Sequence, residues 1–202
     1  MSASNDRDRK FKVVLCGNSG VGKTTIFQRI ESGKVSEFSA PTVGSSYLNR
    51  TVMYQNRPIN MSIWDTAGQD QFRTILPVYF RGSDYVIIVF DITSIDTYNA
   101  IENWAKLIKD TAPPYVKFSI LGNKSDLDHK RTVDVDQVQQ LVSLIGAQNY
   151  YEVSAKNGDG IDDFINYLAQ CLGEASQTNS NPPTVQIGAS TTDATKKSEC
   201  GC

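Results

Sequence analysis

The chain has 202 residues, of which 40% are hydrophobic and 21% are charged, values typical of a soluble protein with one globular core. Its formal net charge of -2 gives no basic footprint, so we expect no nucleic-acid partner. Residues 1–10 do not resemble a secretory signal, and no apolar run approaches the roughly 20 residues of a membrane span. We therefore expect a cytoplasmic protein.

Apolar runs alternate with helical patterns along most of the chain. Short runs of apolar residues predict strands at 11–16, 50–55, 59–65, 85–90, 118–121 and 151–153. Apolar residues at helical spacing predict helices at 23–31, 95–110, 135–145 and 161–172. Asn56, Arg57 and Pro58 are expected to form the turn that joins the second and third strands.

This alternation of strands and helices predicts an α/β fold with a mostly parallel sheet. Ligands of such folds bind beyond the carboxyl ends of the strands, so the loops after the strands are the candidate sites. We expect one folded domain over 10–173 and a flexible N-terminal extension over 1–9. Residues 174–202 are rich in Ser, Thr, Asn, Gln and Pro, and this composition predicts a disordered tail.

The first loop after a strand carries a phosphate-binding pattern. Its sequence, Gly17-Asn18-Ser19-Gly20-Val21-Gly22-Lys23-Thr24, matches G-x-x-x-x-G-K-[ST] between a predicted strand and a predicted helix. Glycines allow the backbone to wrap a phosphate, Lys23 would reach the β- and γ-phosphates, and Thr24 would bind Mg²⁺. The alternative is a glycine-rich turn with an exposed lysine.

A second pattern, Asp65-Thr66-Ala67-Gly68-Gln69, ends the third predicted strand. Asp65 could approach the metal, Gly68 could donate its N–H to the γ-phosphate, and Gln69 could orient the attacking water. Taken alone, D-x-x-G is a weak signal, and Gln69 would then be a solvated loop residue. Thr42 lies in the loop before the second predicted strand, and we expect its hydroxyl to close on Mg²⁺ only when a γ-phosphate is present. Its alternative is a threonine in an ordinary loop.

A third pattern, Asn123-Lys124-Ser125-Asp126, follows the strand at 118–121 and would select the base of a bound nucleotide. Taken alone, N-K-x-D could be an ordinary polar turn. The carboxylate of Asp126 can accept hydrogen bonds from N1–H and the 2-amino group of guanine, which adenine does not offer. Asn123 could fix the loop or contact the base, and the stem of Lys124 could lie on the purine face. After the last strand, the segment Ser154-Ala155-Lys156 could place a backbone N–H against guanine O6.

Together these residues resemble the Ras superfamily of small GTPases over nearly all of 11–172, and within it the Rab family. The likeness rests on four further segments and on the terminal Cys200-Gly201-Cys202: Trp64 to Gln69, Phe72 to Ile75, Tyr79 to Gly82, and Phe90 to Thr93. Residues 35–38 and 44–48 are similar to the early-endosomal Rab subgroup. The resemblance implies a P-loop NTPase three-layer sandwich, in which helices cover both faces of a six-stranded, mostly parallel sheet with one antiparallel strand.

The resemblance also implies a Mg²⁺-dependent switch that binds GTP or GDP, hydrolyses GTP slowly and acts in vesicle trafficking, with an endosomal role suggested. Gln69 would be the catalytic residue, and the metal would be held by Thr24, Thr42 and, through water, Asp65. The nucleotide would contact Ser19, Gly20, Val21, Gly22, Lys23, Thr24, Thr25, Thr42, Gly68, Asn123, Lys124, Asp126, Ser154, Ala155 and Lys156.

The implied partners of this monomer are an exchange factor, a GTPase-activating protein, a GDP-dissociation inhibitor, a prenylation escort protein and GTP-state effectors. Effectors would contact the aromatic residues Tyr47, Trp64 and Tyr79, although Trp64 fits core packing equally well. The chain departs from the Rab pattern at Asp70 and Gln71, where Rabs usually carry glutamate and arginine, and at Val35, where an aromatic residue is expected against the nucleotide.

The terminal cysteines Cys200 and Cys202 could form a disulfide, hold a metal or carry lipid. The Rab-like C-x-C ending implies geranylgeranyl groups on both, and two lipid chains anchor a protein stably where one does not. The protein would then cycle between the cytosol and the cytoplasmic face of intracellular membranes. The alternatives are another signalling GTPase of the Ras superfamily, a freely turning over P-loop ATPase or nucleotide kinase, and a hydrolytically inert adaptor.

Overall fold

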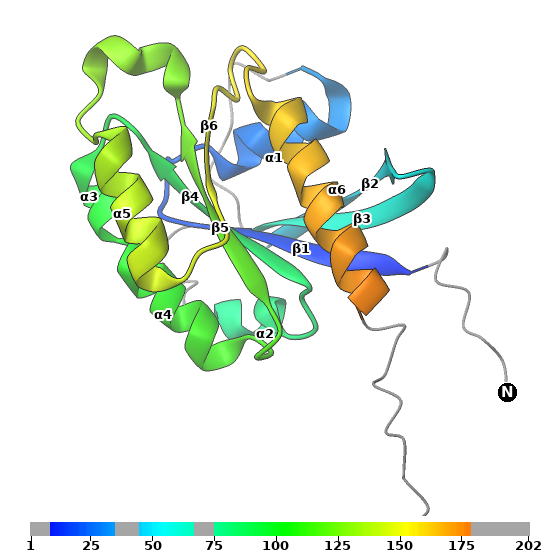
Figure 1. Ribbon diagram of the computed structural model, residues 1–202. Helices are drawn as coiled ribbons and strands as arrows, with labels where there is room; N and C mark the ends of the chain where they lie inside the picture. The colour runs from blue at the N-terminus through cyan, green and yellow to red at the C-terminus, as the bar shows by residue number, and fades with distance from the viewer. Residues whose placement is uncertain (1–8, 35–44, 67–74, 179–202) are drawn as a thin grey trace, which may run out of the picture.

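The computed structural model describes residues 9–34, 45–66 and 75–178 (Figure 1). Its six-stranded sheet has the order β2-β3-β1-β4-β5-β6. The β2–β3 pair is antiparallel and the other neighbours are parallel, as expected. The strands are β1 (Lys10–Cys16), β2 (Ser45–Tyr54), β3 (Arg57–Thr66), β4 (Tyr85–Asp91), β5 (Lys117–Asn123) and β6 (Tyr150–Val153).

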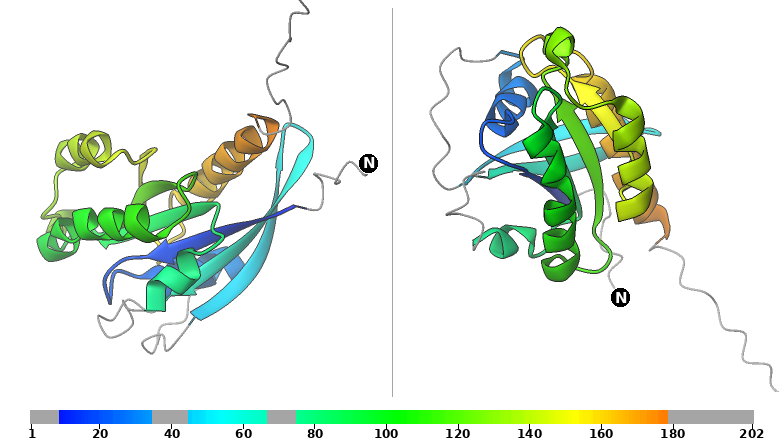
Figure 2. Two further views of the ribbon diagram at one scale, coloured as in Figure 1. Left: turned by 90° about the horizontal axis from the view of Figure 1, so that it is seen from below. Right: turned by 90° about the vertical axis from the view of Figure 1, so that its left-hand side faces the viewer.

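Helices cover both faces of this sheet (Figures 1 and 2). On one face, α1 (Lys23–Ser32) and α6 (Ile161–Thr178) pack on Val13 and Leu15 of β1. On the other face, α2 (Leu76–Phe80), α4 (Ile101–Thr111) and α5 (Val135–Ile145) contribute to one apolar core together with Val14 and Cys16. Both faces of the central strands are therefore buried, which explains their continuous apolar sequences. The predicted three-layer α/β sandwich is confirmed.

The hairpin between β2 and β3 differs from the expected turn. Its two connecting residues are Gln55 and Asn56, with φ of 47° and 61°, whereas Arg57 and Pro58 belong to β3. Positive φ at both central residues is the conformation that fits the right-handed twist of a two-residue hairpin. The prediction that Arg57 and Pro58 lie in the turn is therefore wrong.

The structure has two helices, α3 (Ile95–Asn99) and α4, where a single helix was expected at 95–110. They meet at Ala100, which keeps right-handed helical backbone angles. The short α2 and the 3₁₀ helix η3 (Ser125–Lys130) were not predicted. Within the described residues, no helix is long and apolar enough to cross a bilayer.

Residues 174–178 were expected to belong to the disordered tail. In the structure they are helical, because α6 continues to Thr178. The part of α6 around Gly173 lies against the β2–β3 hairpin, because a Cβ on Gly173 would lie 2.6 Å from the ring of Tyr54. The Tyr54 hydroxyl also donates a hydrogen bond to Glu174 Oε1 at 3.2 Å. These contacts come from a distant strand and leave no pattern in the tail sequence itself.

Candidate functional site

The loop from Gly17 to Gly22 connects β1 to α1 at the carboxyl edge of the sheet. Gly17, Gly20 and Gly22 have φ of 137°, 76° and 95°, a region that side chains disfavour. A Cβ on Gly17 would lie 2.1 Å from the carbonyl oxygen of Val89, and one on Gly22 would lie 2.3 Å from Asn123 Nδ2. Glycine is therefore required at both positions, by backbone angle and by close approach.

Lys23 begins α1 and lies almost fully buried beneath this loop, with 4% of its surface exposed. Its ammonium donates to the carbonyl oxygens of Gly17 at 2.9 Å and Asn18 at 2.8 Å. Burial lowers the pKa of Lys23 to about 8, although the nearby Asp65 opposes this shift. A buried cation among neutral carbonyls, at a glycine loop that opens a helix, is suited to binding an anion.

Thr24 and Asp65 form the second part of the site. The hydroxyl of Thr24 donates to Asp65 Oδ2 at 2.7 Å across a sequence separation of 41 residues. Parallel pairing of β1 with β3 sets Leu15 opposite Asp65 and so brings this carboxylate to the loop. Among the described residues, no group of three or more His, Cys, Asp or Glu side chains is placed so that it could hold a metal ion. A hydroxyl and one carboxylate nevertheless fit Mg²⁺, which usually binds few protein oxygens together with substrate phosphates.

Asn123 lies at the end of β5. It connects the loop 17–22, here called the phosphate loop, to the segments 123–126 and 154–156, here called the base loops. Its Nδ2 donates to the carbonyl oxygen of Val21 at 2.8 Å, and its Oδ1 accepts the backbone N–H of Ala155 at 3.0 Å. Asn123 is buried, so these contacts are shielded from water. These contacts fit the first role considered for Asn123, which is fixing the loops, and contact with the base stays a prediction.

Asp126 is held by the segment that follows β6. The buried Ser154 hydroxyl donates to Asp126 Oδ1 at 2.7 Å and accepts the backbone N–H of Asn157 at 3.1 Å. The sequence-predicted groups Asn123-Lys124-Ser125-Asp126 and Ser154-Ala155-Lys156 are thus brought together. The hydrogen bond from Ser154 orients the Asp126 carboxylate.

Lys124 has a left-handed φ of 71°, and its ammonium pairs with Asp91 Oδ2 at 2.6 Å. Burial alone would raise the pKa of Asp91, but hydrogen bonds from Lys124 and Thr93 outweigh it and lower that pKa below its usual value. The ion pair anchors the head of Lys124 and so restrains its stem at the base loop.

Two site contacts were not predicted from the sequence. The indole N–H of Trp104, on α4, donates to Asn18 Oδ1 at 2.8 Å across 86 residues. Arg29, on α1, donates to the carbonyl oxygens of Ala155 at 2.8 Å and Lys156, the former across 126 residues. Trp104 lies within the helix predicted at 95–110, but no local pattern signals either contact.

The aromatic residues Tyr47, Trp64 and Tyr79 gather on one surface. Tyr47 lies opposite Trp64 in the β2–β3 pair, with ring centroids 5.1 Å apart, and Tyr79 of α2 lies 6.3 Å from Trp64. Tyr47 is 60% exposed and Trp64 is half-buried. Trp64 packs on the rings at either side and stays partly accessible, so packing accounts for part of its surface, and effector binding stays a prediction.

Several predicted positions lie outside the described residues. They are Val35, Thr42, Gly68, Gln69, Asp70, Gln71, Cys200 and Cys202.

The sheet order, the glycine loop and the base loops together have the architecture of a Ras-like P-loop GTPase. A model of the Ras family matches residues 12–173. The chain is 35% identical to Ras-related protein Rab-13 of Bos taurus, over 89% of this chain and 91% of that protein. It is 40% identical to Ras-related protein Rab-22A of Homo sapiens, over 78% and 80%, and 38% identical to Rab-22A of Canis lupus familiaris, over 87% and 88%.

The chain therefore belongs to the Ras family of small GTPases, in its Rab branch. It is a GTP-hydrolysing enzyme.

Proposed function

We propose that this protein is a Mg²⁺-dependent guanine-nucleotide switch that is recruited to membranes in vesicle trafficking, with an endosomal role. The observation that carries the nucleotide assignment is the position of Asn123. Its side chain joins the phosphate loop at Val21 to the base loop at Ala155, with 2.8 and 3.0 Å contacts. A phosphate-binding part and a base-binding part are therefore parts of one rigid site.

At the phosphate end, Lys23 can exchange its neutral carbonyl partners for phosphate oxygens, which compensate its buried charge better. Thr24, Asp65 and Thr42 would hold Mg²⁺, which when bound neutralises charge on the phosphates. At the base end, Asp126 would accept hydrogen bonds from N1–H and the 2-amino group of guanine. The other proposed contacts come from the glycine loop, Thr25, Lys124 and the segment 154–156.

Equilibrium binding of GDP, GTP and ATP, with and without Mg²⁺, tests this assignment. We expect tight binding of both guanine nucleotides, weaker binding when Mg²⁺ is chelated, and far weaker binding of ATP. ATP binding as tight as GTP binding would instead support an ATPase or nucleotide kinase. Loss of guanine nucleotide affinity altogether would contradict the proposal.

For hydrolysis we assign Gln69 to orienting the attacking water, and Thr42 and Gly68 to sensing the γ-phosphate. The intrinsic rate is expected to be slow, because an arginine supplied by a partner is typically worth about 10³ to 10⁵ in rate. Single-turnover hydrolysis by Gln69→Leu should be much slower than by the parent protein at equal GTP loading. An unchanged rate would remove Gln69 from this role.

We assign Tyr47, Trp64 and Tyr79 to binding of effectors in the GTP state. β2 begins at Ser45 and β3 ends at Thr66, so the two proposed γ-phosphate sensors lie in segments next to the strands that carry Tyr47 and Trp64. An exchange factor, an activating protein, a GDP-dissociation inhibitor and an escort protein complete the proposed cycle. Alanine at Tyr47 should weaken capture of GTP-specific partners while leaving GDP binding intact.

We assign the membrane anchor to geranylgeranyl groups on Cys200 and Cys202. The full chain should be found on intracellular membranes, and the Cys200→Ser, Cys202→Ser variant should be diffuse in the cytosol. Identical distributions of the two proteins would contradict the anchoring assignment.

A further inference from the structure

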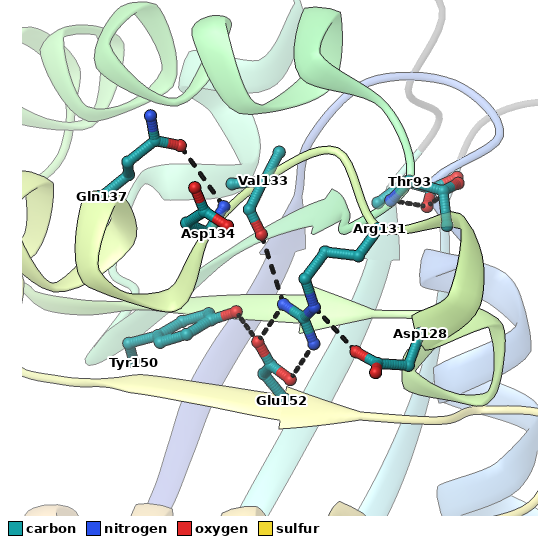
Figure 3. A network of polar contacts seen from close by, with 9 residues as sticks. Thr93, Asp128, Arg131, Val133, Asp134, Gln137, Tyr150 and Glu152 are labelled. Atoms are coloured by element: carbon teal, nitrogen blue, oxygen red, sulfur yellow. Dashed lines mark hydrogen bonds and ion pairs between the residues drawn. The ribbon is translucent and has the colours of Figure 1, made fainter.

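A network of charged and aromatic side chains joins η3 to β6 (Figure 3). Arg131 follows the 3₁₀ helix η3 and donates two hydrogen bonds to Glu152 of β6, from Nη1 to Oε1 at 2.8 Å and from Nη2 to Oε2 at 2.7 Å. Its Nε donates to Asp128 Oδ1 at 2.7 Å. A two-point contact between guanidinium and carboxylate fixes orientation as well as distance. Arg131 thus holds η3 and β6 in a defined relation.

Both joined elements lead directly into base-loop residues. Asp126 is the second residue of η3, and β6 ends at Val153, next to Ser154. The hydrogen bond from Ser154 to Asp126 spans the same two segments on the side of the site. The Arg131–Glu152 pair therefore closes a second connection between the segments that position the Asp126 carboxylate.

Tyr150 extends the network to β5. Its hydroxyl donates to Glu152 Oε1, and its ring stacks on Phe90 with centroids 6.1 Å apart. A Cβ on Gly122 would lie 2.7 Å from that hydroxyl, so the glycine makes room for the tyrosine. Gly122 directly precedes Asn123, which joins the phosphate and base loops. Through Tyr150 the network therefore reaches Phe90 of β4 and lies against Gly122 near the end of β5.

The pair is partly shielded from water, with side-chain exposures of 19% for Arg131 and 25% for Glu152. The hydrogen bond from Arg131 lowers the pKa of Glu152, which keeps the carboxylate charged and the pair formed. The charged carboxylate of Glu152 accepts hydrogen bonds from Arg131 Nη1, Arg131 Nη2 and the Tyr150 hydroxyl. These contacts hold Glu152 more firmly than a single exposed ion pair would.

We propose that Arg131, Glu152 and Tyr150 are positioning residues that set guanine selectivity and the rate of GDP release. They contact no nucleotide in this proposal and act through the placement of Asp126 and Ser154. This inference rests on the proposed guanine-nucleotide function.

Release of GDP and of IDP, which lacks the 2-amino group of guanine, tests the inference. We would measure both rates on the full chain for Glu152→Gln, Arg131→Lys and Tyr150→Phe. We expect Glu152→Gln to release GDP about tenfold faster, and Tyr150→Phe roughly threefold faster. Release of IDP should change less. A displaced Asp126 loses hydrogen bonds to N1–H and the 2-amino group of guanine, but only the one to N1–H of hypoxanthine, the base of IDP. The Mg²⁺ concentration that half-maximally retains GDP should not change.

Arg9→Gln is the matched control, because it removes the Arg9–Asp84 ion pair of 2.9 Å at the amino ends of the central strands β1 and β4, away from the site at their carboxyl ends. It should leave both rates and their ratio unchanged. Equal acceleration of GDP and IDP release would mean that the network only stabilises the fold, and would overturn the inference, as would unchanged rates. Tyr150→Phe removes a single hydroxyl and provides the test if Glu152→Gln does not fold. Failure of the parent protein to bind GDP would overturn the inference together with the proposed function.

Discussion

The base end and the phosphate end of the site differ in the groups that pair with their charged side chains. At the base end, charged and polar side chains pair with one another: Lys124 with Asp91, and Ser154 with Asp126. At the phosphate end, the buried ammonium of Lys23 donates to two neutral carbonyl oxygens, and its pKa is lowered to about 8. In the proposed function, Ser154 positions the Asp126 carboxylate for the base, whereas Lys23, which already lies near the charge of Asp65, would exchange its carbonyl partners for phosphate oxygens. We infer that the first gives selectivity and the second gives affinity.

The largest effect is expected at the phosphate end. Lys23→Met should weaken GDP binding by about a thousandfold, because truncating one partner of a buried charge pair costs several kcal/mol. Equilibrium titration with labelled GDP measures the loss. Lys109→Met, at an exposed position on α4, is the control and should bind as the parent does. An affinity within about tenfold of the parent would break the comparison.

A smaller effect, restricted to the choice of base, is expected at Asp126. Asp126→Asn should weaken GDP binding by about a hundredfold and improve binding of XDP, whose 2-oxo group can accept from the new amide. Competition between GDP and XDP measures this exchange. Asp136→Asn, on the exposed side of α5, should leave the preference unchanged. Parallel loss of both nucleotides would show that Asp126 supports the fold rather than the base.

The pH dependence of stability separates the two ends further. Folding lowers the pKa of Lys23 from 10.5 to about 8, because burial disfavours its charge. Between these values the unfolded chain keeps a proton that the folded chain has released, so stability rises with pH through this window. The contribution is at most about 1.4 kcal/mol per pH unit for one group.

Urea unfolding of nucleotide-free parent and Lys23→Met proteins measures this term. The stability advantage of Lys23→Met should shrink as pH rises from 8 to 10.5, because only the parent gains stability from Lys23. Saturating GDP should remove the slope, since phosphate keeps Lys23 charged. Parallel profiles for the two proteins would contradict the description of the phosphate end.

The smallest effect is expected on the aromatic surface, away from both ends. Tyr47→Ala removes an exposed ring stacked on Trp64 and should lower the free energy of unfolding by about 0.5 kcal/mol. GDP release should not change. Met53→Ala, equally exposed on the same strand, is the control and should cost less. Faster GDP release from Tyr47→Ala alone would show that this surface is coupled to the site in the GDP state.

The phosphate loop was predictable because its pattern encodes local conformation. The spacing of Gly17, Gly22 and Lys23 requires particular backbone angles between a strand and a helix, and those are the angles found. The strand and helix positions followed from periodicity for the same reason. The α2 helix gave no such signal, because five residues are too short for a periodic pattern to emerge.

The amino-acid sequence by itself determined the α/β alternation, the glycine loop and which side chains could recognise phosphate and guanine. Only the tertiary structure decided the long-range hydrogen bonds from Asn123 to Val21, from Trp104 to Asn18 and from Arg131 to Glu152. It also decided that α6 continues to Thr178. Local patterns report the conformation of neighbouring residues. Contacts between residues far apart depend on strand order and register, which are set when the whole core packs.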